Sequence, residues 1–249
     1  MKRTAVFVPT SGDPLEAIVH EPDGSPVACA VALPGAMSRA ETNRKWARAA
    51  DALADLGIVV LRYNYLDGSD ETHMDDADRR QWAREGIEWF RNRMAGLDLL
   101  VCGHCYGSGV ALSYAAANRT LGLALITPFL GSLGRHDRAT MHAMQLLSRV
   151  ASRAGVRLPS RTRSLDPEPS RDLVTIGSSP RPWVLVGERD YQWRSWTNPA
   201  TAPPELASVD IEVVRGVQLH SARTPMGQDA LIERLAGWAA RTLAARAQS

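Results

Sequence analysis

Short apolar runs alternate along the chain with longer segments in which apolar residues recur at helical spacing. Eight strands are predicted, at residues 4–8, 15–20, 27–33, 58–63, 97–101, 121–126, 183–186 and 209–214. Amphipathic helices are predicted at residues 43–56, 74–94, 110–117 and 229–245. The first two strands are joined by a short turn and predict an antiparallel edge, whereas most later strands are apolar throughout, as in strands buried on both faces. The alternation predicts an α/β fold, a mostly parallel eight-stranded sheet with helices on both faces.

This alternation breaks between residues 131 and 179. The segment has no clear strand and contains only a helix-like stretch, at about residues 139–154, and a stretch rich in Pro, Ser and Arg. Because the strand pattern resumes at Trp183, the segment is predicted to be an insertion within one domain that spans residues 1–249. A chain of 249 residues, 45% of them hydrophobic, is large enough for one domain with a full core.

Charge and cysteine usage narrow the possible partners and compartments. The formal net charge is only +2, so we expect no nucleic-acid partner. The N-terminus has no long apolar run, so we expect neither a signal peptide nor a membrane anchor, and no membrane partner. The three cysteines, Cys29, Cys102 and Cys105, form no disulfide framework. These features together predict a cytoplasmic protein.

The clearest chemical signal is the sequence LDLLVCGHCYGSGVALS at residues 97–113. It predicts a strand, a tight turn and a helix, with Cys105 in the turn. Gly103 and Gly107 lie two residues on either side of Cys105, where a sharp strand-to-helix bend needs residues without a Cβ atom. The bend also places the thiol at a helix N-terminus, whose unpaired N–H groups favour the thiolate. We therefore expect Cys105 to be an exposed and polarised nucleophile.

This motif resembles the nucleophile elbow Gly-x-Ser-x-Gly of the α/β-hydrolase superfamily, with cysteine in place of serine. In that superfamily a nucleophile, an acid and a histidine follow three strands, in this order along the chain. The resemblance implies that Cys105 is the nucleophile, that Asp190 is the acid, and that His220 is the general base. It also implies that the insertion, at about residues 131–179, is a helical cap over the active site.

The resemblance further implies an oxyanion hole. Superfamily members donate one backbone N–H from the loop after the strand that corresponds to residues 27–33. Here that loop begins Pro34-Gly35-Ala36, so the implied donors are the N–H groups of Ala36 and Tyr106. The Pro-Gly pair is also compatible with an ordinary turn.

Other assignments of the chemical residues stay open. Glu188 is an alternative acid, and His104, His136 and His142 are alternative bases. Cys102 forms a C-x-x-C spacing with the proposed nucleophile, which is compatible with a redox pair, although its position in a strand predicts that it points into the core. No zinc-ligand spacing, phosphate loop or dinucleotide fingerprint occurs, so neither a metal nor a cofactor is expected.

A cysteine nucleophile favours an acyl thioester substrate, because transfer from a thioester onto a thiol is nearly even in energy. Such an acyl group is carried by coenzyme A or by the phosphopantetheine of a carrier protein. Residues 131–165 contain seven arginines and a single acid, and Arg149, Arg153 and Arg157 recur at four-residue spacing. A basic helix face of this kind could steer an acidic carrier protein to the active site, and it is equally compatible with a solvated surface.

Within the superfamily, the chain resembles the cysteine-based Dieckmann cyclases, which release products from carrier proteins, and the dienelactone hydrolases. The sequence therefore predicts an acyl-transfer enzyme in which Cys105 takes the acyl group and cyclisation or hydrolysis releases it. A dienelactone-hydrolase-like ester or lactone hydrolase is the alternative enzyme. A binding protein on a hydrolase scaffold is an alternative of another class. The oligomeric state stays open.

Overall fold

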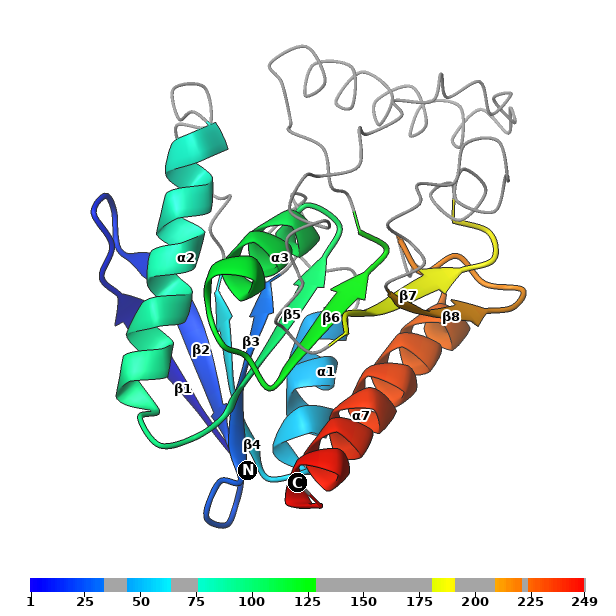
Figure 1. Cartoon of the computed structure of the whole chain (residues 1–249), viewed down its shortest axis with the longest axis horizontal. Coiled ribbons are helices and arrows are strands. Elements are labelled where there is room, and N and C mark those ends of the chain that lie inside the picture. Colours follow the sequence, from blue (N-terminus) through cyan, green and yellow to red (C-terminus); the bar gives the residue numbers. More distant parts are fainter. Residues whose placement is uncertain (34–43, 64–75, 129–180, 191–208, 221–223, 249) are drawn as a thin grey trace.

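The computed structural model describes residues 1–33, 44–63, 76–128, 181–190, 209–220 and 224–248. These residues contain an eight-stranded sheet with the strand order β1-β2-β4-β3-β5-β6-β7-β8 (Figure 1). Strand β2 pairs antiparallel with β1 and with β4, and every other neighbouring pair is parallel. The strands are β1 (Lys2–Val8), β2 (Leu15–Glu21), β3 (Ala28–Leu33), β4 (Ile58–Tyr63), β5 (Leu99–His104), β6 (Gly122–Ile126), β7 (Trp183–Gly187) and β8 (Asp210–Val214). The predicted antiparallel edge and mostly parallel sheet are confirmed.

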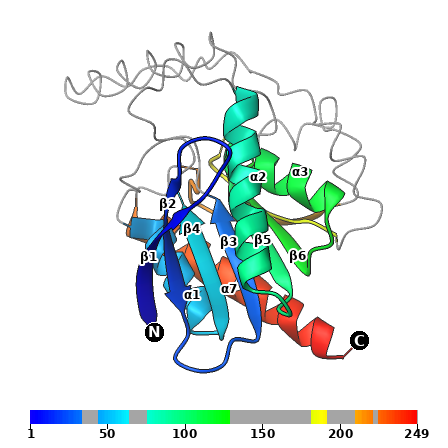
Figure 2. The same ribbon diagram turned by 90° about the vertical axis from the view of Figure 1, so that its left-hand side faces the viewer.

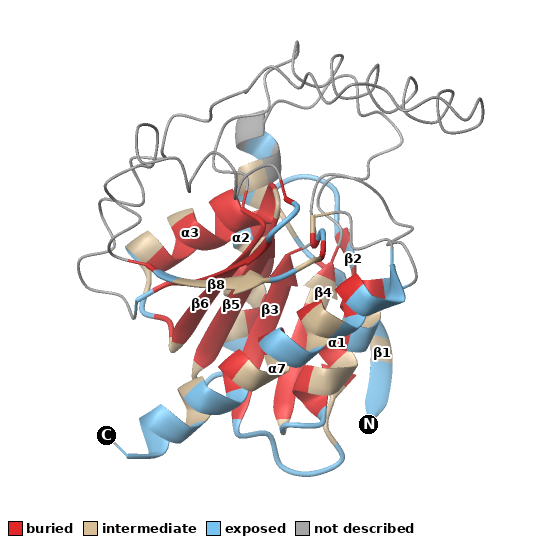
Figure 3. Ribbon diagram, turned by 90° about the vertical axis from the view of Figure 1, so that its right-hand side faces the viewer, coloured by how far each residue is buried: buried red, intermediate tan, exposed pale blue. Residues whose placement is uncertain are grey.

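Helices cover both faces of this sheet. Helix α2 (Asp76–Arg93) lies across one face, on the same side as α3 (Gly107–Ala117) (Figure 2). Helices α1 (Lys45–Ala54) and α7 (Pro225–Ala247) lie side by side on the other face (Figure 3). The parallel strands therefore lie between two layers of helices.

Alternate residues of the central strands serve the two layers, as the twofold period of a strand requires. In β3, Val31 and Leu33 pack with α2 and α3, whereas Ala30 and Ala32 pack with α1 and α7. The same alternation places Cys102 of β5 in the core beneath α1 and α7. This two-sided burial explains why the central strands are apolar throughout.

Two helix starts differ from the sequence prediction. Helix α7 begins at Pro225 rather than at residue 229, because the Thr224 side chain accepts a hydrogen bond from the Gly227 N–H and proline is well suited to a first helical turn. Helix α3 begins at Gly107, directly after the turn, rather than at residue 110. Among the described residues, no helix has the length and apolar character needed to cross a membrane. The predicted cap at residues 131–179 lies outside the described residues.

Candidate active site

Cys105 occupies a strained turn between β5 and α3. Its φ of 51° lies in the left-handed region, which costs a non-glycine residue on the order of 1 kcal/mol. Hydrogen bonds hold this conformation: the Cys105 N–H donates to the Ile126 carbonyl (3.0 Å), and the Ser108 N–H donates to the Cys105 carbonyl (3.1 Å). The Ser108 hydroxyl also donates to the Gly103 carbonyl (2.9 Å). The turn is therefore fixed from neighbouring β6 and from its own helix.

Gly103 permits the close approach of strand and helix. A Cβ atom there would lie 2.5 Å from the Gly107 carbonyl oxygen and 2.6 Å from the Ser108 Cα. Both atoms belong to backbone and cannot move aside without shifting α3. Glycine at position 103 is thus required by the geometry on which the sequence prediction relied.

Asp190 follows β7 and is fully buried. Its Oδ2 accepts from the Gly187 N–H (2.7 Å), and its Oδ1 accepts from the His220 backbone N–H (2.9 Å). Burial raises the pKa of the Asp190 carboxyl above its usual value, although hydrogen bonds from the N–H groups of His220, Gly187 and Leu219 oppose the rise. The alternative acid, Glu188, is exposed and accepts from the Gly216 N–H (2.7 Å). Asp190 is thus the carboxylate that the structure brings to His220.

His220 lies in the loop after β8, and it is partly exposed. Burial of its imidazole and the nearby positive charge of Lys45 lower the pKa of His220 to about 4. The ring is therefore neutral at neutral pH and has a lone pair for a proton. This state is the one that a general base requires.

The Cys105 thiol differs from the sequence expectation. The residue is only partly exposed, and burial raises the pKa of the thiol to about 11, although a hydrogen bond from the Tyr106 N–H and the charge of Lys45 oppose this. Desolvation therefore outweighs the Tyr106 N–H and the Lys45 charge, so the thiol is protonated at neutral pH, and Cys105 is less exposed than the sequence predicted. A thiol in this state needs a base to take its proton.

Tyr106 places its backbone N–H beside the nucleophile. That N–H hydrogen-bonds the Cys105 thiol and favours its ionised form. The Tyr106 ring is buried, and the Arg80 guanidinium lies over it, 5.1 Å from its centroid. The other implied donor, Ala36, lies outside the described residues.

Lys45 was not singled out in the sequence. It begins α1, yet it is only 7% exposed. Its charge adds to the lowering of the His220 pKa, and it opposes the rise that burial causes in the pKa values of Cys105 and Asp190. The signal was present in the helical spacing, because position 45 falls on the same stripe as Ala49, and a lysine on the buried face of a helix marks a site that requires a cation.

His104 was weighed only as an alternative base. It is 5% exposed, and burial together with the charges of Lys45 and His220 lowers its pKa well below the usual value, although a hydrogen bond to the His220 backbone opposes this. Its Nε2 lies 3.2 Å from the backbone carbonyl oxygen of His220. The two histidine rings are 6.0 Å apart between centroids. His104 thus joins the residue before the nucleophile to the loop of the proposed base.

The other sequence candidates are placed as follows. Cys102 is fully buried, and burial raises its pKa to about 12, so it is an unreactive core residue. None of the three cysteines, all of which are described, forms a disulfide. Among the described residues, no three His, Cys, Asp or Glu side chains gather as a metal site would. Outside the described residues lie His136, His142, Arg149, Arg153 and Arg157.

Comparison with known proteins supports the architecture. No protein-family model matches the chain, and no curated protein matches its sequence. A lidless α/β serine hydrolase from Xanthomonas campestris is 18% identical, with a TM-score of 0.60, over 96% of this chain and 94% of that protein. A dienelactone hydrolase from Anabaena variabilis is 14% identical, with a TM-score of 0.63, over 95% and 96%. The α/β-hydrolase GrgF from Penicillium sp. sh18 is 15% identical, with a TM-score of 0.64, over 98% and 100%. With this sheet order and these neighbours, the chain has the α/β-hydrolase fold.

Proposed function

We propose that the chain is an acyl-transfer enzyme in which Cys105 forms a thioester intermediate with the acyl group of a thioester substrate. The observation that carries the proposal is the position of Cys105 on a left-handed bend, beside a loop in which His220 is bound to a buried carboxylate. All three residues follow parallel strands of one sheet, at the edge where sites form in this type of fold. The arrangement supports a cysteine, histidine and aspartate triad.

The proposed first step is a proton transfer coupled to attack. His220 takes the proton of the Cys105 thiol, and the sulfur attacks the carbonyl carbon of the substrate. The resulting oxyanion accepts a hydrogen bond from the Tyr106 N–H and, on the sequence argument, from that of Ala36. One such donor contributes about 3 kcal/mol in comparable sites. When the intermediate collapses, the substrate's thiolate leaves and takes its proton from the His220 imidazolium.

The pKa values favour general-base catalysis over a resting ion pair. With the thiol pKa at about 11 and the imidazole pKa at about 4, both groups are neutral before substrate binds. Lys45 stabilises the developing negative charge, since its cation lowers the pKa of Cys105. The buried Asp190 holds the His220 backbone and supplies the negative charge that stabilises the imidazolium.

Release of the acyl group by intramolecular cyclisation, of the Dieckmann type, or by water completes the proposal. A carrier protein as donor, docking on the arginines of residues 131–165, and a cytoplasmic location are parts of the same proposal that depend on the sequence alone. The carrier-protein donor is tested together with the chemistry below.

Intact-protein mass spectrometry tests the intermediate. The wild-type chain is incubated with an acyl-carrier thioester and with the same acyl group on N-acetylcysteamine, and a Cys105→Ala variant is the control. The expected result is a mass increase of one acyl group that maps to Cys105 and is absent from the variant. An adduct on another residue, or an equal adduct on the variant, contradicts the mechanism. Faster labelling by the carrier than by N-acetylcysteamine supports a carrier-protein partner.

A second candidate is an ester or lactone hydrolase, favoured by the similarity of the fold to a dienelactone hydrolase. Turnover of a simple lactone far above that of the N-acetylcysteamine thioester would favour it. A binding protein without turnover is the remaining alternative. Slow alkylation of Cys105 by iodoacetamide does not support that alternative, because burial already raises the pKa of this thiol.

A further inference from the structure

His104 directly precedes Cys105, but its side chain contacts the loop after β8 that contains His220. It is the last residue of β5, and its strand position places it on the same face as Leu100 and Cys102, toward α1 and α7. From there its Nε2 reaches the His220 carbonyl oxygen at 3.2 Å. Because a carbonyl can only accept, Nε2 carries the proton and His104 is the donor.

The imidazole of His104 is held in one state. The Trp46 ring packs against it, with centroids 5.5 Å apart and planes tilted by 54°. Its Nδ1 is buried and has no hydrogen-bond partner among the described residues. With Nε2 donating and Nδ1 enclosed, the ring has no accessible lone pair to receive a proton from a substrate or a thiol. This geometry argues against His104 as the base.

The His220 peptide groups are bound on both sides. Its N–H donates to Asp190 Oδ1 at 2.9 Å, and its carbonyl accepts from His104 Nε2. We infer that His104 is a positioning residue. It fixes the backbone of His220, the proposed base, relative to Cys105, the nucleophile that directly follows His104 in the chain. The inference depends on the proposed function, since it assigns His104 a role through His220.

Two substitutions separate the hydrogen bond from the packing. His104→Phe keeps an aromatic ring against Trp46 but removes the donor, and it leaves the His220 carbonyl without its partner. His104→Gln removes the ring but places an amide N–H at similar reach. Recovery in the glutamine variant therefore reports the donor and not the ring.

The experiment measures acylation of Cys105 by p-nitrophenyl acetate, followed as release of p-nitrophenolate, in a double-mutant cycle with His220→Ala. We expect His104→Phe to slow acylation about tenfold and His104→Gln to return it to within about threefold of wild type. In the His220→Ala background, His104→Phe should cause no further loss, because its effect is exerted through His220. Thermal unfolding of each variant identifies any that fails to fold, and if His104→Phe does, His104→Leu, which also lacks a donor, replaces it in the cycle.

The outcomes distinguish this inference from the proposed function. Equal acylation by His104→Phe and wild type, or an equal loss in the His220→Ala background, overturns the positioning role while His220 stays the base. A His104→Gln variant no better than the phenylalanine variant overturns it as well. Acylation that is insensitive to His220→Ala overturns the proposed function and this inference together.

Discussion

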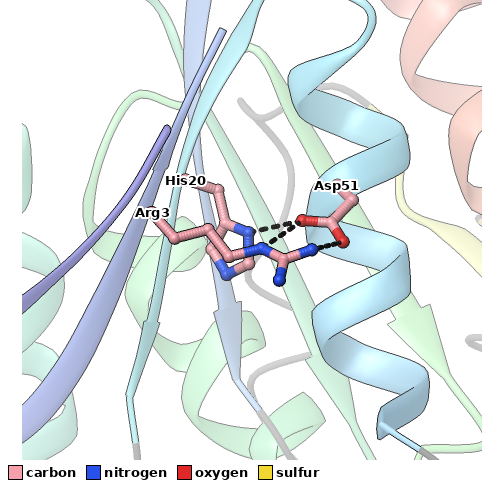
Figure 4. Close-up of polar contacts among 3 residues, drawn as sticks. All are labelled: Arg3, His20 and Asp51. Carbon is pink, nitrogen blue, oxygen red and sulfur yellow. Dashed lines mark hydrogen bonds and ion pairs between the residues drawn. The ribbon is translucent and has the colours of Figure 1, made fainter. Parts of the chain in front are cut away.

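His20 and His220 each lie beside a buried or partly buried aspartate, but the two pairs are bonded differently. In the first pair, His20 Nδ1 lies 2.8 Å from Asp51 Oδ1, and Arg3 binds both carboxylate oxygens of Asp51 (Figure 4). Partial burial tends to raise the pKa of Asp51, but the hydrogen bonds from Arg3 and His20 outweigh it and hold the pKa below its usual value. Both oxygens of the Asp51 carboxylate therefore bind side chains of β1 and β2 and connect these strands to α1.

In the second pair, formed by Asp190 and His220, no arginine binds the carboxylate among the described residues. Asp190 accepts backbone N–H groups, and burial raises its pKa, whereas Asp51 has an arginine as partner. The His220 backbone is hydrogen-bonded by His104, the residue directly before Cys105, and a buried lysine lowers the pKa of both His220 and Cys105. The His20–Asp51 pair therefore has a structural role. The features that favour a catalytic role for the second pair are the neighbouring nucleophile, Cys105, and the nearby cation of Lys45.

Replacing each histidine in turn tests this contrast most strongly. We expect His220→Ala to lower the acylation rate of Cys105 by about 10³-fold, since it removes the general base. His20→Ala removes a fully buried ring and its hydrogen bond to Asp51, so it should lower the free energy of unfolding. Because His20 is not part of the candidate site, the acylation rate should stay within about twofold of wild type. Acylation by p-nitrophenyl acetate and urea unfolding measure both. A large rate loss in His20→Ala, with the protein folded, would contradict the contrast.

The aspartates provide a second, smaller comparison. Asp190→Asn keeps an acceptor for the His220 N–H but removes the negative charge, so acylation should fall about 10²-fold. Its amide NH2 would face the buried Gly187 N–H, which donates to the second carboxylate oxygen of Asp190, so the free energy of unfolding should also fall by about 1–3 kcal/mol. Asp51→Asn removes the ion pair with Arg3 and should cost about 1–3 kcal/mol of the free energy of unfolding, with acylation unchanged. The same effect of both substitutions on acylation would mean that Asp190 has no distinct role.

Which of these features the sequence could predict depends on how local each one is. The strands β3 and β5 were predictable because continuous apolar runs reflect burial on both faces, and the cysteine turn because Gly103 must lack a Cβ atom. The ionisation state of the thiol was not predictable, because it depends on how deeply distant segments of the chain bury Cys105, and that burial raises the pKa of the thiol. The bond from His104 to the His220 carbonyl joins residues 116 positions apart, and no spacing rule indicates it.

Lys45 gives a third test, which concerns the pH dependence. Burial and the charge of Lys45 lower the pKa of His220, so Lys45→Met should raise that pKa from about 4 toward its usual 6.5. Because acylation needs neutral His220, the acid limb of the pH–rate profile should move upward, by about one pH unit. Arg3→Met removes a cation from the other pair and should leave the limb in place. Profiles of acylation from about pH 4 to about pH 8 measure the shift.

An acid limb that is the same in Lys45→Met and wild type would contradict the assignment of Lys45 to the site. A limb that moves equally in Arg3→Met would contradict the distinction between the two pairs, since Arg3 bonds the carboxylate beside His20.

The smallest expected effect concerns stability, where the two histidines should behave alike. Burial lowers the pKa of His20 below its usual 6.5, although the hydrogen bond that His20 donates to Asp51 opposes this. The unfolded chain therefore binds a proton that the folded chain does not as the pH falls below 6.5. Stability due to neutral His20 is therefore complete above that pH and is lost as the pH falls toward the lowered pKa of the folded state. Between pH 7.5 and pH 5.5 we therefore expect His20→Gln to lose less stability than wild type does.

His220→Gln should also lose less stability than wild type, by about 1 kcal/mol, because the pKa of His220 is lowered to about 4 and its proton linkage covers this whole range. Asp51 does not interfere, since its pKa lies below 3.8 and its contribution is lost only at lower pH. Urea unfolding at the two pH values measures the difference. A pH-independent gap between wild type and either variant would show that the histidine in question is not held neutral by the fold. Equal linkage of both residues, with catalysis confined to one, would show that burial sets the charge of each histidine while its neighbours decide what the ring can do.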